Sequence, residues 1–559
     1  MRARTKARVA LVATALALAA GPPAAAEAPA TGAQPFIVGG TSPDPALASG
    51  VVRIVTVAGA LCSGTVIAPS WVLTAGHCIE DRATVSGGGT TLTGLTWSIG
   101  ATGLRHPFYT SSPSLLRYDF GLYQLDTPAP VVSPAPLADY ADTQSWAAGS
   151  PSRTLGWGVP GSGLPPSDVL LQASMTVVDD RQCDENDTII GAIFDPGTSL
   201  CTYAPNVSGC NGDSGGPLFT QQAGRWVQVG LTSYGPAGCW LHTVAAWMPA
   251  GLPWIRSVVA GGPPMVRLWG ADRYGTAADV ATAFDPGGVV FVATGENFPD
   301  SVAAGVTASR LGGPVLLVAR DRVPDITAAA LRYLRPSRVV VAGGPQAVAD
   351  AVVRQVAAIT GVTVERRGGT DRYDTARLLG EMVWPGATGG RVWVAGGAAF
   401  ADPLAASAAA ATFGEPFVLV GDAGLPDSAK SLLARLAPTS IVAVGDGVTL
   451  GAATRDALRV LAPLTEIADP DVHVRAIRVW DGLPTASDVV MATSGDFADA
   501  LAGVALAGAP PAGPLLLTPK ACLPAPVRDR LRAFGPQLVW LLGGPAALDA
   551  GIESYGTCP

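Results

Sequence analysis

The sequence has few histidines and few charged residues. Four of its 559 residues are histidine, 14% are charged, and the formal net charge is −8. Acidic residues outnumber basic ones both in residues 37–259 and in residues 266–559. Because a protein that binds phosphate groups needs a positive surface, we expect no nucleic acid among the partners.

Sequence motifs for metals and nucleotides are also missing. The chain has no Cys-x-x-Cys pair and no histidine cluster, and residues 266–559 contain no GxGxxG or GxxxxGK sequence after a strand. We therefore expect no metal and no cofactor.

The N-terminus has the plan of a secretory signal peptide. Residues 1–26 contain four basic residues, then the apolar run Val9 to Ala20, then Ala24-Ala25-Ala26. The run is shorter than the ~20 residues that span a membrane. A later low-charge stretch, Ala500 to Leu517, is interrupted by Pro510, Pro511 and Gly513. We expect a secreted protein with no transmembrane segment once residues 1–26 are removed.

Eight cysteines in an exported chain indicate paired disulfides. The sequence alone does not determine which cysteines pair.

One short motif has the composition of a nucleophile loop, namely Gly212-Asp213-Ser214-Gly215-Gly216-Pro217. A serine attacks a carbonyl when a base removes its proton and backbone N–H groups receive the charge on the substrate oxygen. Glycines beside Ser214 would let the N–H groups of Gly212 and Ser214 converge as an oxyanion hole. Taken alone, the motif could equally be a glycine-rich surface turn.

Two further motifs complete a possible triad. His77 lies in Thr74-Ala75-Gly76-His77-Cys78, and Asp119 begins Asp119-Phe120-Gly121-Leu122. The order His, Asp, Ser is one of three common chain orders for such triads. With Ile37-Val38-Gly39-Gly40, Gly156-Trp157-Gly158 and Ser233-Tyr234-Gly235, residues 37–259 closely resemble the trypsin-like (chymotrypsin-fold) serine peptidases.

Short strand-like runs such as Val51 to Val57 and Trp226 to Leu231, separated by Gly, Pro and Ser turns, predict an all-β domain. The resemblance implies two six-stranded β-barrels with the active site between them, acting on protein or peptide substrates. It implies that Ser214 is the nucleophile, His77 the general base and then acid, and Asp119 the group that orients the imidazole. His106 resembles a loop position with no catalytic role, and we expect it to be solvated.

The resemblance also implies activation and a specificity pocket. Residues 27–36 would be a propeptide, and cleavage before Ile37 would free an α-amino group that pairs with Asp213. Ser208 would form an uncharged pocket floor between walls that include Ser233 and Gly235, which favours bulky apolar side chains. Thr243 or a neighbour could narrow this pocket. Because Phe36 precedes Ile37, the enzyme could process itself.

The resemblance supplies disulfide pairs as well. It implies Cys62 with Cys78, Cys183 with Cys201, and Cys210 with Cys239. This leaves Cys522 for Cys558.

After a predicted linker, residues 260–265, three markers recur. The first comprises Thr294 to Asp300, Gly396 to Asp402 and Thr493 to Asp499, with a shared Phe and Asp. The second is Gly343-Gly344-Pro345, Gly445-Asp446-Gly447 and Gly543-Gly544-Pro545. The third is Asp272-Arg273-Tyr274 and Asp371-Arg372-Tyr373, altered in the last unit to Trp480-Asp481-Gly482-Leu483.

Apolar strands alternate with helices around these markers, which predicts parallel sheets covered by helices. Residues 266–559 resemble three type 2 cell-wall-binding repeats, divided at about 266–360, 361–465 and 466–559. The resemblance implies Rossmann-like or flavodoxin-like units around a pseudo-threefold axis that bind an anionic wall polymer. We expect each shared Phe to fill the core and each shared Asp to cap a helix N-terminus.

We therefore expect a secreted, wall-associated serine endopeptidase. Two alternatives stay open: a surface adhesion or scaffold protein whose peptidase-like half is inert, and an enzyme whose repeats bind the substrate.

Overall fold

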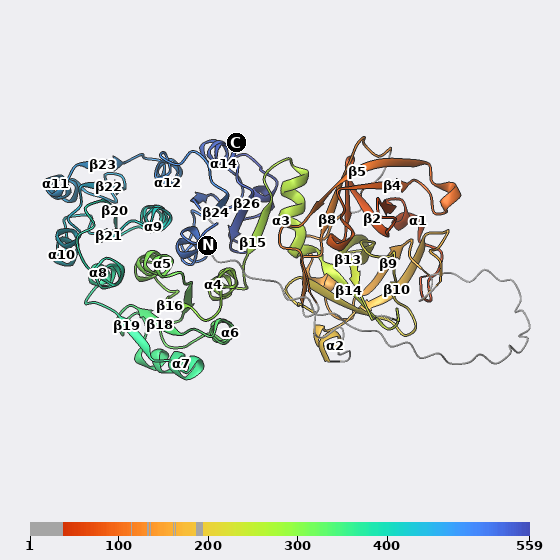
Figure 1. Cartoon of the computed structure of the whole chain (residues 1–559), viewed down its shortest axis with the longest axis horizontal. Coiled ribbons are helices and arrows are strands. Elements are labelled where there is room, and N and C mark those ends of the chain that lie inside the picture. Colours follow the sequence, from red (N-terminus) through yellow and green to blue (C-terminus); the bar gives the residue numbers. More distant parts are fainter. Residues whose placement is uncertain are drawn as a thin grey trace, which may run out of the picture.

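The computed structural model describes residues 37–559 apart from 113–114, 131–133, 135, 160, 162–163, 186–193, 237 and 512. The expected signal peptide and propeptide lie outside the described residues. In Figure 1 the N-terminal half lies on the right and the repeat half on the left, with helix α3 (Met248–Val259) between them.

The N-terminal half consists of two closed antiparallel barrels, as the resemblance implied. The first, in the order β1-β2-β3-β8-β5-β4, contains β1 (Val51–Thr56), β2 (Leu61–Ala68), β3 (Trp71–Thr74), β4 (Arg82–Gly87), β5 (Trp97–Arg105) and β8 (Gly121–Leu125). The second, in the order β10-β11-β14-β13-β12-β9, contains β9 (Pro151–Gly156), β10 (Leu171–Val177), β11 (Ser199–Tyr203), β12 (Pro217–Gln222), β13 (Arg225–Tyr234) and β14 (His242–Trp247).

Short elements connect and close the barrels. They are a hairpin, β6 (Thr110–Ser112) and β7 (Leu115–Arg117), the helices α1 (Pro45–Ala48) and α2 (Asp180–Glu185), and the 3-10 turns η1 (Gly76–Cys78), η2 (Leu92–Gly94) and η3 (Thr143–Trp146). Helix α3 packs on the first barrel, where Leu252 and Trp254 join the buried cluster around Phe120. The helix therefore fixes the end of the first half against the barrel that contains His77.

The repeat half contains three four-stranded parallel sheets. The first two have the orders β17-β16-β18-β19 and β21-β20-β22-β23, and the third has the order β15-β26-β24-β25. The strands are β15 (Met265–Leu268), β16 (Val289–Thr294), β17 (Val315–Val318), β18 (Arg338–Ala342), β19 (Val364–Arg367), β20 (Arg391–Gly396), β21 (Phe417–Val420), β22 (Ser440–Val444), β23 (Leu464–Ile467), β24 (Asp488–Thr493), β25 (Leu515–Thr518) and β26 (Leu538–Leu542). Continuous runs of buried Val and Leu suit strands covered on both faces.

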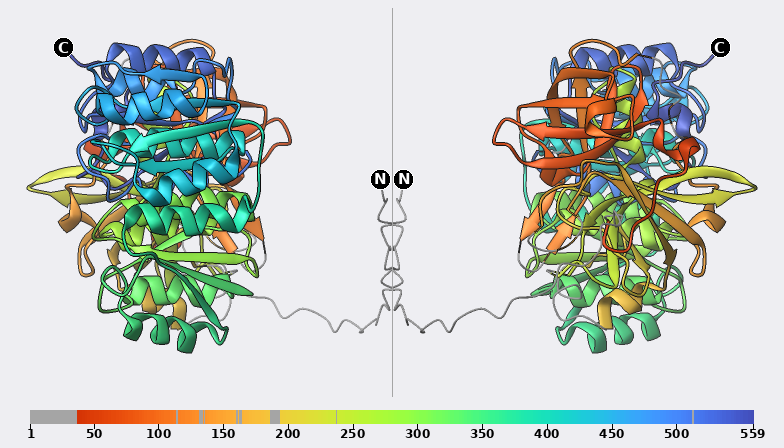
Figure 2. Two further views of the ribbon diagram at one scale, coloured as in Figure 1. Left: turned by 90° about the vertical axis from the view of Figure 1, so that its left-hand side faces the viewer. Right: turned by 90° about the vertical axis from the view of Figure 1, so that its right-hand side faces the viewer.

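Helices flank these sheets, and Figure 2 shows the three units one above another, from green through teal to blue. They are α4 (Arg273–Val280), α5 (Pro299–Leu311), α6 (Asp325–Leu334), α7 (Asp350–Thr360), α8 (Arg372–Val383), α9 (Ala401–Phe413), α10 (Asp427–Leu436), α11 (Ala452–Leu461), α12 (Val472–Arg478), α13 (Gly503–Ala507), α14 (Ala525–Phe534) and α15 (Ala550–Glu553), with the 3-10 turn η4 (Ala281–Ala283) after α4. Equivalent helices α5, α9 and α13 pack against one another at the centre.

The structural units are offset from the sequence repeats. Strand β15, at the start of the repeat half, pairs in parallel with β26 near its end, with Met265 opposite Val539. It occupies the edge position that β19 and β23 occupy in the other sheets. The first strand therefore completes the third sheet, and the three units form a closed ring.

The shared Phe and Asp residues hold the ring together, and the expected helix caps are wrong. Phe298 and Phe400 each lie 6.0 Å from Phe497 between ring centroids, so the three rings meet between units. Asp300 and Asp402 lie inside the first turns of α5 and α9, and Asp499 precedes α13. All three carboxylates point to the neighbouring unit. Asp300 lies beside Thr375, Asp402 bonds Arg475, and Asp499 lies beside Thr276. Each carboxylate is therefore used for contact between units.

The glycine marker recurs because it lies against the same carboxylates. Gly343 and Gly543 have φ values of 105° and 96°, and a Cβ on them would be 2.6 and 2.3 Å from Asp300 and Asp499 oxygens. Only glycine fits both the backbone conformation and the space.

The third marker was misplaced in the last unit. Helix α12 follows β23 as α8 follows β19, and its N-cap is Asp471. The counterpart of Asp371-Arg372-Tyr373 is therefore Asp471-Val472-His473, and Trp480 lies beyond the helix. Loss of the arginine and tyrosine had hidden the match.

A buried ion network fixes the two halves to each other. Glu553 is fully buried and accepts from Arg256 at 2.7 Å, Arg267 at 2.6 Å and Tyr140 at 2.9 Å. Tyr140 and Arg256 belong to the first half, while Arg267 and Glu553 belong to the repeats. The intervening linker is a tight turn, in which the Gly262 N–H donates to the Ser257 carbonyl at 2.9 Å.

No helix in the described part of the chain has the length and apolar character needed to cross a membrane.

Candidate active site

His77 and Asp119 meet at one end of the first barrel. Strands β3 and β8 are antiparallel, with Thr74 opposite Gly121, so residues after β3 lie beside residues before β8. The Asp119 carboxylate accepts from His77 Nδ1 at 2.8 Å and from the His77 backbone N–H at 2.9 Å. Arg105 holds the η1 turn by donating to the Gly76 carbonyl at 2.8 Å.

Burial and the nearby negative charge have opposite effects on the pKa of the His77 imidazole. Burial lowers the pKa of His77, but the Asp119 charge and hydrogen bond outweigh it, so the pKa is raised above its usual value. Asp119 is 3% exposed and accepts a third hydrogen bond, from Ser233 Oγ at 2.5 Å. The sequence placed Ser233 only on the pocket wall, and its contact with Asp119 was missed because no local pattern joins residues so far apart.

The loop of Ser214 is held between the two barrels. The Ser214 carbonyl accepts from the Ser63 N–H at 2.9 Å and lies 3.7 Å from the Cys78 sulfur, next to His77. Gly215 has a φ of 81°, and a Cβ there would lie 2.0 Å from Thr74 Oγ1, so the turn requires glycine. Within the described residues no hydrogen bond joins Ser214 Oγ to His77. The structure thus joins two of the three groups directly and places the third beside them.

Within the residues that the structure describes, the two predicted oxyanion donors have no acceptor. In the described parts of the chain, the Gly212 and Ser214 N–H groups make no hydrogen bond. Their neighbours do, because the Asp213 N–H donates to Cys210 and the Gly215 N–H donates to Thr232. Both predicted donors therefore keep the capacity to bind an oxygen atom.

Asp213 and Ile37, the predicted activation pair, are both fully buried. The Asp213 carboxylate accepts from the Cys210 and Gly158 N–H groups, each at 2.8 Å. Burial raises the pKa of Asp213 to about 7, although these hydrogen bonds act to lower it. A Cβ on Gly156 would lie 2.2 Å from Asp213 Oδ1, which explains one glycine of Gly156-Trp157-Gly158.

Ser208 and Thr243 meet at the floor of the predicted pocket. Ser208 Oγ lies 2.9 Å from the Gly209 carbonyl, 3.2 Å from the His242 carbonyl and 3.1 Å from Thr243 Oγ1. Both side chains are buried and uncharged. A Cβ on Gly235 would be 3.0 Å from the His242 carbonyl, so the wall and floor are close together.

His106 is buried, and the expectation of a solvated loop histidine is wrong. Its ring is stacked on Tyr118 at 4.7 Å and contacts Trp254 edge-on at 5.2 Å. Burial lowers the pKa of His106 to about 3, so the ring is neutral at physiological pH. Tyr118 and Trp254 lie far from His106 in the sequence, and no local pattern indicates these contacts.

The structure contains the disulfides Cys62–Cys78, Cys183–Cys201, Cys210–Cys239 and Cys522–Cys558. In the described chain, Cys62, His77 and Cys78 form the one group close enough to suggest a metal site. Because the two sulfurs are bonded to each other, they are not available as thiolate ligands.

Known proteins resemble both halves. Residues 37–255 match the family model described as Trypsin, and residues 267–353, 366–454 and 467–553 match the model described as cell wall binding domain 2. Proproteinase E of Bos taurus is 33% identical over 218 residues, 36% of this chain and 83% of that protein. Granzyme M of Homo sapiens is 34% identical over 207 residues, 35% of this chain and 79% of that protein. The solved structure of Cwp6 from Clostridium difficile aligns at 17% identity and a TM-score of 0.49, covering 91% of this chain and 68% of its own.

Proposed function

Because the chain belongs to the trypsin-like serine proteases over residues 37–255 and continues into three cell wall binding repeats, we propose that it is an exported serine endopeptidase held at the cell wall. The observation that carries this proposal is the Asp119 carboxylate, which accepts from His77 at 2.8 Å beside the Ser214 loop. The same observation disfavours an inert adhesion protein, which would have no use for an imidazole oriented by a buried carboxylate.

In the proposed reaction His77 removes the proton of Ser214 Oγ as that oxygen bonds to the substrate carbonyl carbon. The negative charge on the carbonyl oxygen is received by the Gly212 and Ser214 N–H groups. Collapse of this tetrahedral intermediate breaks the C–N bond, and His77 gives its proton to the departing amine. Water then repeats the sequence on the acyl-enzyme, releasing the acid and restoring Ser214.

The buried carboxyl group of Asp213 supports a mechanism for activating the precursor. We propose that cleavage before Ile37 frees an ammonium group that pairs with Asp213, because a buried carboxylate without a cation is costly. The fully buried position of Ile37 and the raised pKa of Asp213 support this pairing.

The pocket floor supports a preference for apolar side chains. Neither Ser208 nor Thr243 carries a charge, so Lys and Arg would gain no partner there. Because Thr243 covers part of the floor, we expect Leu-sized groups to be preferred over Phe. Replacing Thr243 with glycine should raise kcat/KM for Phe relative to Leu roughly tenfold, since a hydrophobic pocket discriminates by one to three kcal/mol. Paired peptide anilides measure this ratio, and an unchanged ratio would contradict the role of Thr243.

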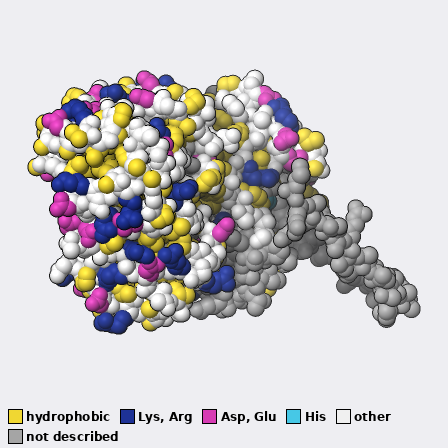
Figure 3. Space-filling model, turned by 60° about the vertical axis from the view of Figure 1, so that its left-hand side comes forward, with side chains coloured by type: hydrophobic (Ala, Val, Ile, Leu, Met, Phe, Trp, Pro, Cys, Tyr) yellow, Lys and Arg dark blue, Asp and Glu magenta, His cyan; other side chains and the backbone are white. Residues whose placement is uncertain are grey.

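Wall attachment is proposed for the repeats, with an anionic wall polymer as ligand. Figure 3 shows basic and acidic side chains interspersed over the face in view, so such a polymer would be held at local basic groups. Sedimentation of the full chain with purified walls, using the Ser214→Ala variant to prevent digestion, tests attachment.

A labelled fluorophosphonate tests the enzymatic proposal. The reagent should label the processed wild type and spare Ser214→Ala, because it requires an activated serine. If processed wild type stays unlabelled, the inert adhesion protein becomes the better interpretation.

A further inference from the structure

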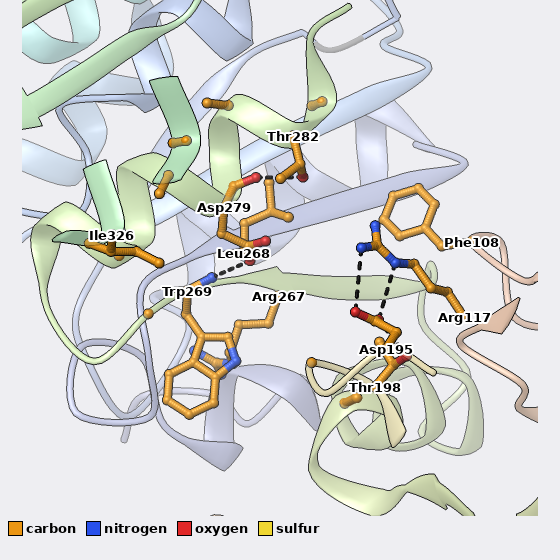
Figure 4. Close-up of a pocket in the computed structure, with 18 of the residues that line it drawn as sticks. Phe108, Arg117, Asp195, Thr198, Arg267, Leu268, Trp269, Asp279, Thr282 and Ile326 are labelled. Atoms are coloured by element: carbon orange, nitrogen blue, oxygen red, sulfur yellow. Dashed lines mark hydrogen bonds and ion pairs between the residues drawn. The ribbon is translucent and has the colours of Figure 1, made fainter. Parts of the chain in front are cut away.

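A cavity of about 1000 Å³ lies between the peptidase and the first repeat unit (Figure 4). Helices α4 and α6 form one wall, with Ile326 and Tyr333 facing the space. Phe108 and Tyr118, from either end of the β6–β7 hairpin, line the opposite side. The cavity thus exists only because both halves are present in one chain.

The hairpin connects this cavity with the predicted triad. Gly76, the residue before His77, packs against the Tyr109 ring, and Thr110 lines the cavity. At the other end of the hairpin, Tyr118 lines the cavity and Asp119 follows it directly. The cavity therefore adjoins the two segments that carry His77 and Asp119.

Helix α6 presents apolar residues to the cavity that its counterparts lack. Ile326 is 48% exposed and Tyr333 is 55% exposed, which is unusual for large apolar side chains on a soluble helix. All three helices follow a proline N-cap, which fixes the alignment. The equivalent positions hold Ser428 and Arg435 in α10, and Pro526 and Ala533 in α14.

The groove between α4 and α6 also lacks the series of ion pairs that fills the equivalent groove of the second unit, between α8 and α10. There, Arg377 bonds Asp374 at 2.8 Å and Glu381 at 2.9 Å, and Glu381 bonds Arg435 at 3.2 Å. In the first unit, the counterparts of these four residues are Gly275, Ala278, Thr282 and Tyr333. Compared with the groove of the second unit, the groove that faces the peptidase is therefore open and apolar.

The charged groups that line the cavity without an ion-pair partner in the described structure are negative. Arg117 is already paired with Asp195, its Nε lying 3.1 Å from a carboxylate oxygen (Figure 4). Asp272 and Asp279 also line the cavity, and within the described residues neither forms an ion pair. In the described part of the chain the Asp279 carboxylate accepts one hydrogen bond, from the Trp269 N–H at 2.9 Å, and burial raises the pKa of Asp279 to about 6. A cation placed here would find two carboxylates and an apolar floor.

We propose that this cavity is an extended substrate site that binds an apolar stretch of the protein substrate carrying a lysine or arginine. The inference rests on the proposed peptidase function. Apolar side chains would contact Ile326 and Tyr333, and the basic group would lie at Asp272 and Asp279. An anionic polymer would be repelled by the same carboxylates, so the cavity differs from a wall-binding surface. The first repeat thereby takes part in substrate selection.

The test compares long and short substrates. A tetrapeptide anilide reports the triad and pocket alone, while longer peptides carry the same cleavage sequence joined, on one side or the other, to an apolar stretch with two lysines. The double variant Ile326→Ser/Tyr333→Arg installs the residues of α10, and Val460→Ser, on the exposed side of α11, is the matched control. The ratio of long to short kcat/KM should fall about tenfold in the double variant and not in the control.

A peptide with glutamate in place of lysine should lose the advantage in the wild type. Equal cleavage of the lysine and glutamate peptides, or an unchanged ratio in the double variant, would overturn the proposal. If the wild type cleaves neither short nor long substrate, the proposed function has failed instead. In that case, fluorescence anisotropy of the labelled lysine stretch with the full-length Ser214→Ala chain still tests whether the cavity binds such a peptide. Binding that Ile326→Ser/Tyr333→Arg abolishes supports the site, and binding that it leaves unchanged contradicts it.

Discussion

At the scale of single residues, Asp119 accepts three hydrogen bonds, and one of them comes from Ser233. Each donor spreads the carboxylate charge, so Ser233 competes with the imidazole for the same oxygen, Oδ2. We propose that this contact makes Ser233 a positioning residue for the imidazole, in addition to its predicted place on the pocket wall.

Replacing Ser233 with alanine should lower kcat/KM roughly tenfold, the scale of one hydrogen bond to a charged group. It should also concentrate charge on Asp119, raise the pKa of His77 and move the acid limb of the pH–rate profile to higher pH. The control is Ser152→Ala, since the buried Ser152 hydroxyl has no hydrogen-bond partner in the described structure. A profile that drops in height without moving would contradict the role given to Ser233.

Because the pKa of Asp213 is raised, we expect the free energy of unfolding of the uncleaved precursor to depend on pH. Its pKa is raised from the ordinary value to about 7, so the folded state binds a proton that the unfolded chain releases. Stability from this group is therefore complete below about pH 4 and is lost as the pH rises to about 7, by up to about 4 kcal/mol.

Urea denaturation of the Ser214→Ala precursor at several pH values measures this dependence, which Asp213→Asn should remove. After cleavage the sign reverses, because an ammonium group stabilises the ionised acid. Cleaved Asp213→Asn enzyme should therefore be weakly active, and full activity would refute the pairing of Ile37 with Asp213.

Short and specific sequence motifs predict His77, Asp119 and Ser214 as a triad, and the structure brings His77 and Asp119 into hydrogen-bonding contact. Roles that depend on distant neighbours were not accessible. The burial of His106 requires Tyr118 and Trp254, and the Ser233 contact requires the two barrels to be assembled.

At the scale of elements, Asp402 fastens one repeat unit to the next. Its carboxylate accepts from Arg475 and Thr449, each at 2.7 Å, and all but 2% of Asp402 is buried. The corresponding contacts elsewhere in the ring use threonine in place of arginine.

Asp402→Ala should destabilise the repeat half by about 1.5–3 kcal/mol, because the buried guanidinium of Arg475 loses its hydrogen bonds to Asp402 and keeps the Asp446 carboxylate at 3.2 Å. Arg475→Thr should cost less, since it recreates the arrangement of Asp300 with Thr375. Far-UV circular dichroism in urea follows the helices, with Asp427→Ala at an exposed ion pair as the control. A larger loss for Arg475→Thr than for Asp402→Ala would contradict this account.

Strands and helices of the repeats were predictable from their alternation, but the partner of β15 was not. Nothing local in Met265–Leu268 indicates an edge beside Leu538–Leu542. The position follows only from closure of the ring, and the same closure gives the shared aspartates their contacts.

At the scale of the whole molecule, the Glu553 network sets the orientation of the peptidase relative to the repeats. Glu553→Ala should leave Arg256 and Arg267 without their shared counterion and cost about 3–5 kcal/mol at the junction. Calorimetry should then resolve separate transitions for the two halves. Asp139→Ala removes a partly exposed partner of Arg256 and should cost less than about 1 kcal/mol. Separate transitions already present in the wild type would show that the halves are not coupled.

Pairing of β15 with β26 sets an order of events during folding. A strand that is made directly after the peptidase must wait for residues 538–542 before its edge is covered, so the ring of repeats cannot close before the last unit has been made. Unlike an open array, which can fold one unit at a time, this ring becomes complete only when its last strand arrives. Loss of a C-terminal segment that includes β26 would therefore expose the edge of β15, which lies beside the peptidase at the opposite end of the repeat sequence.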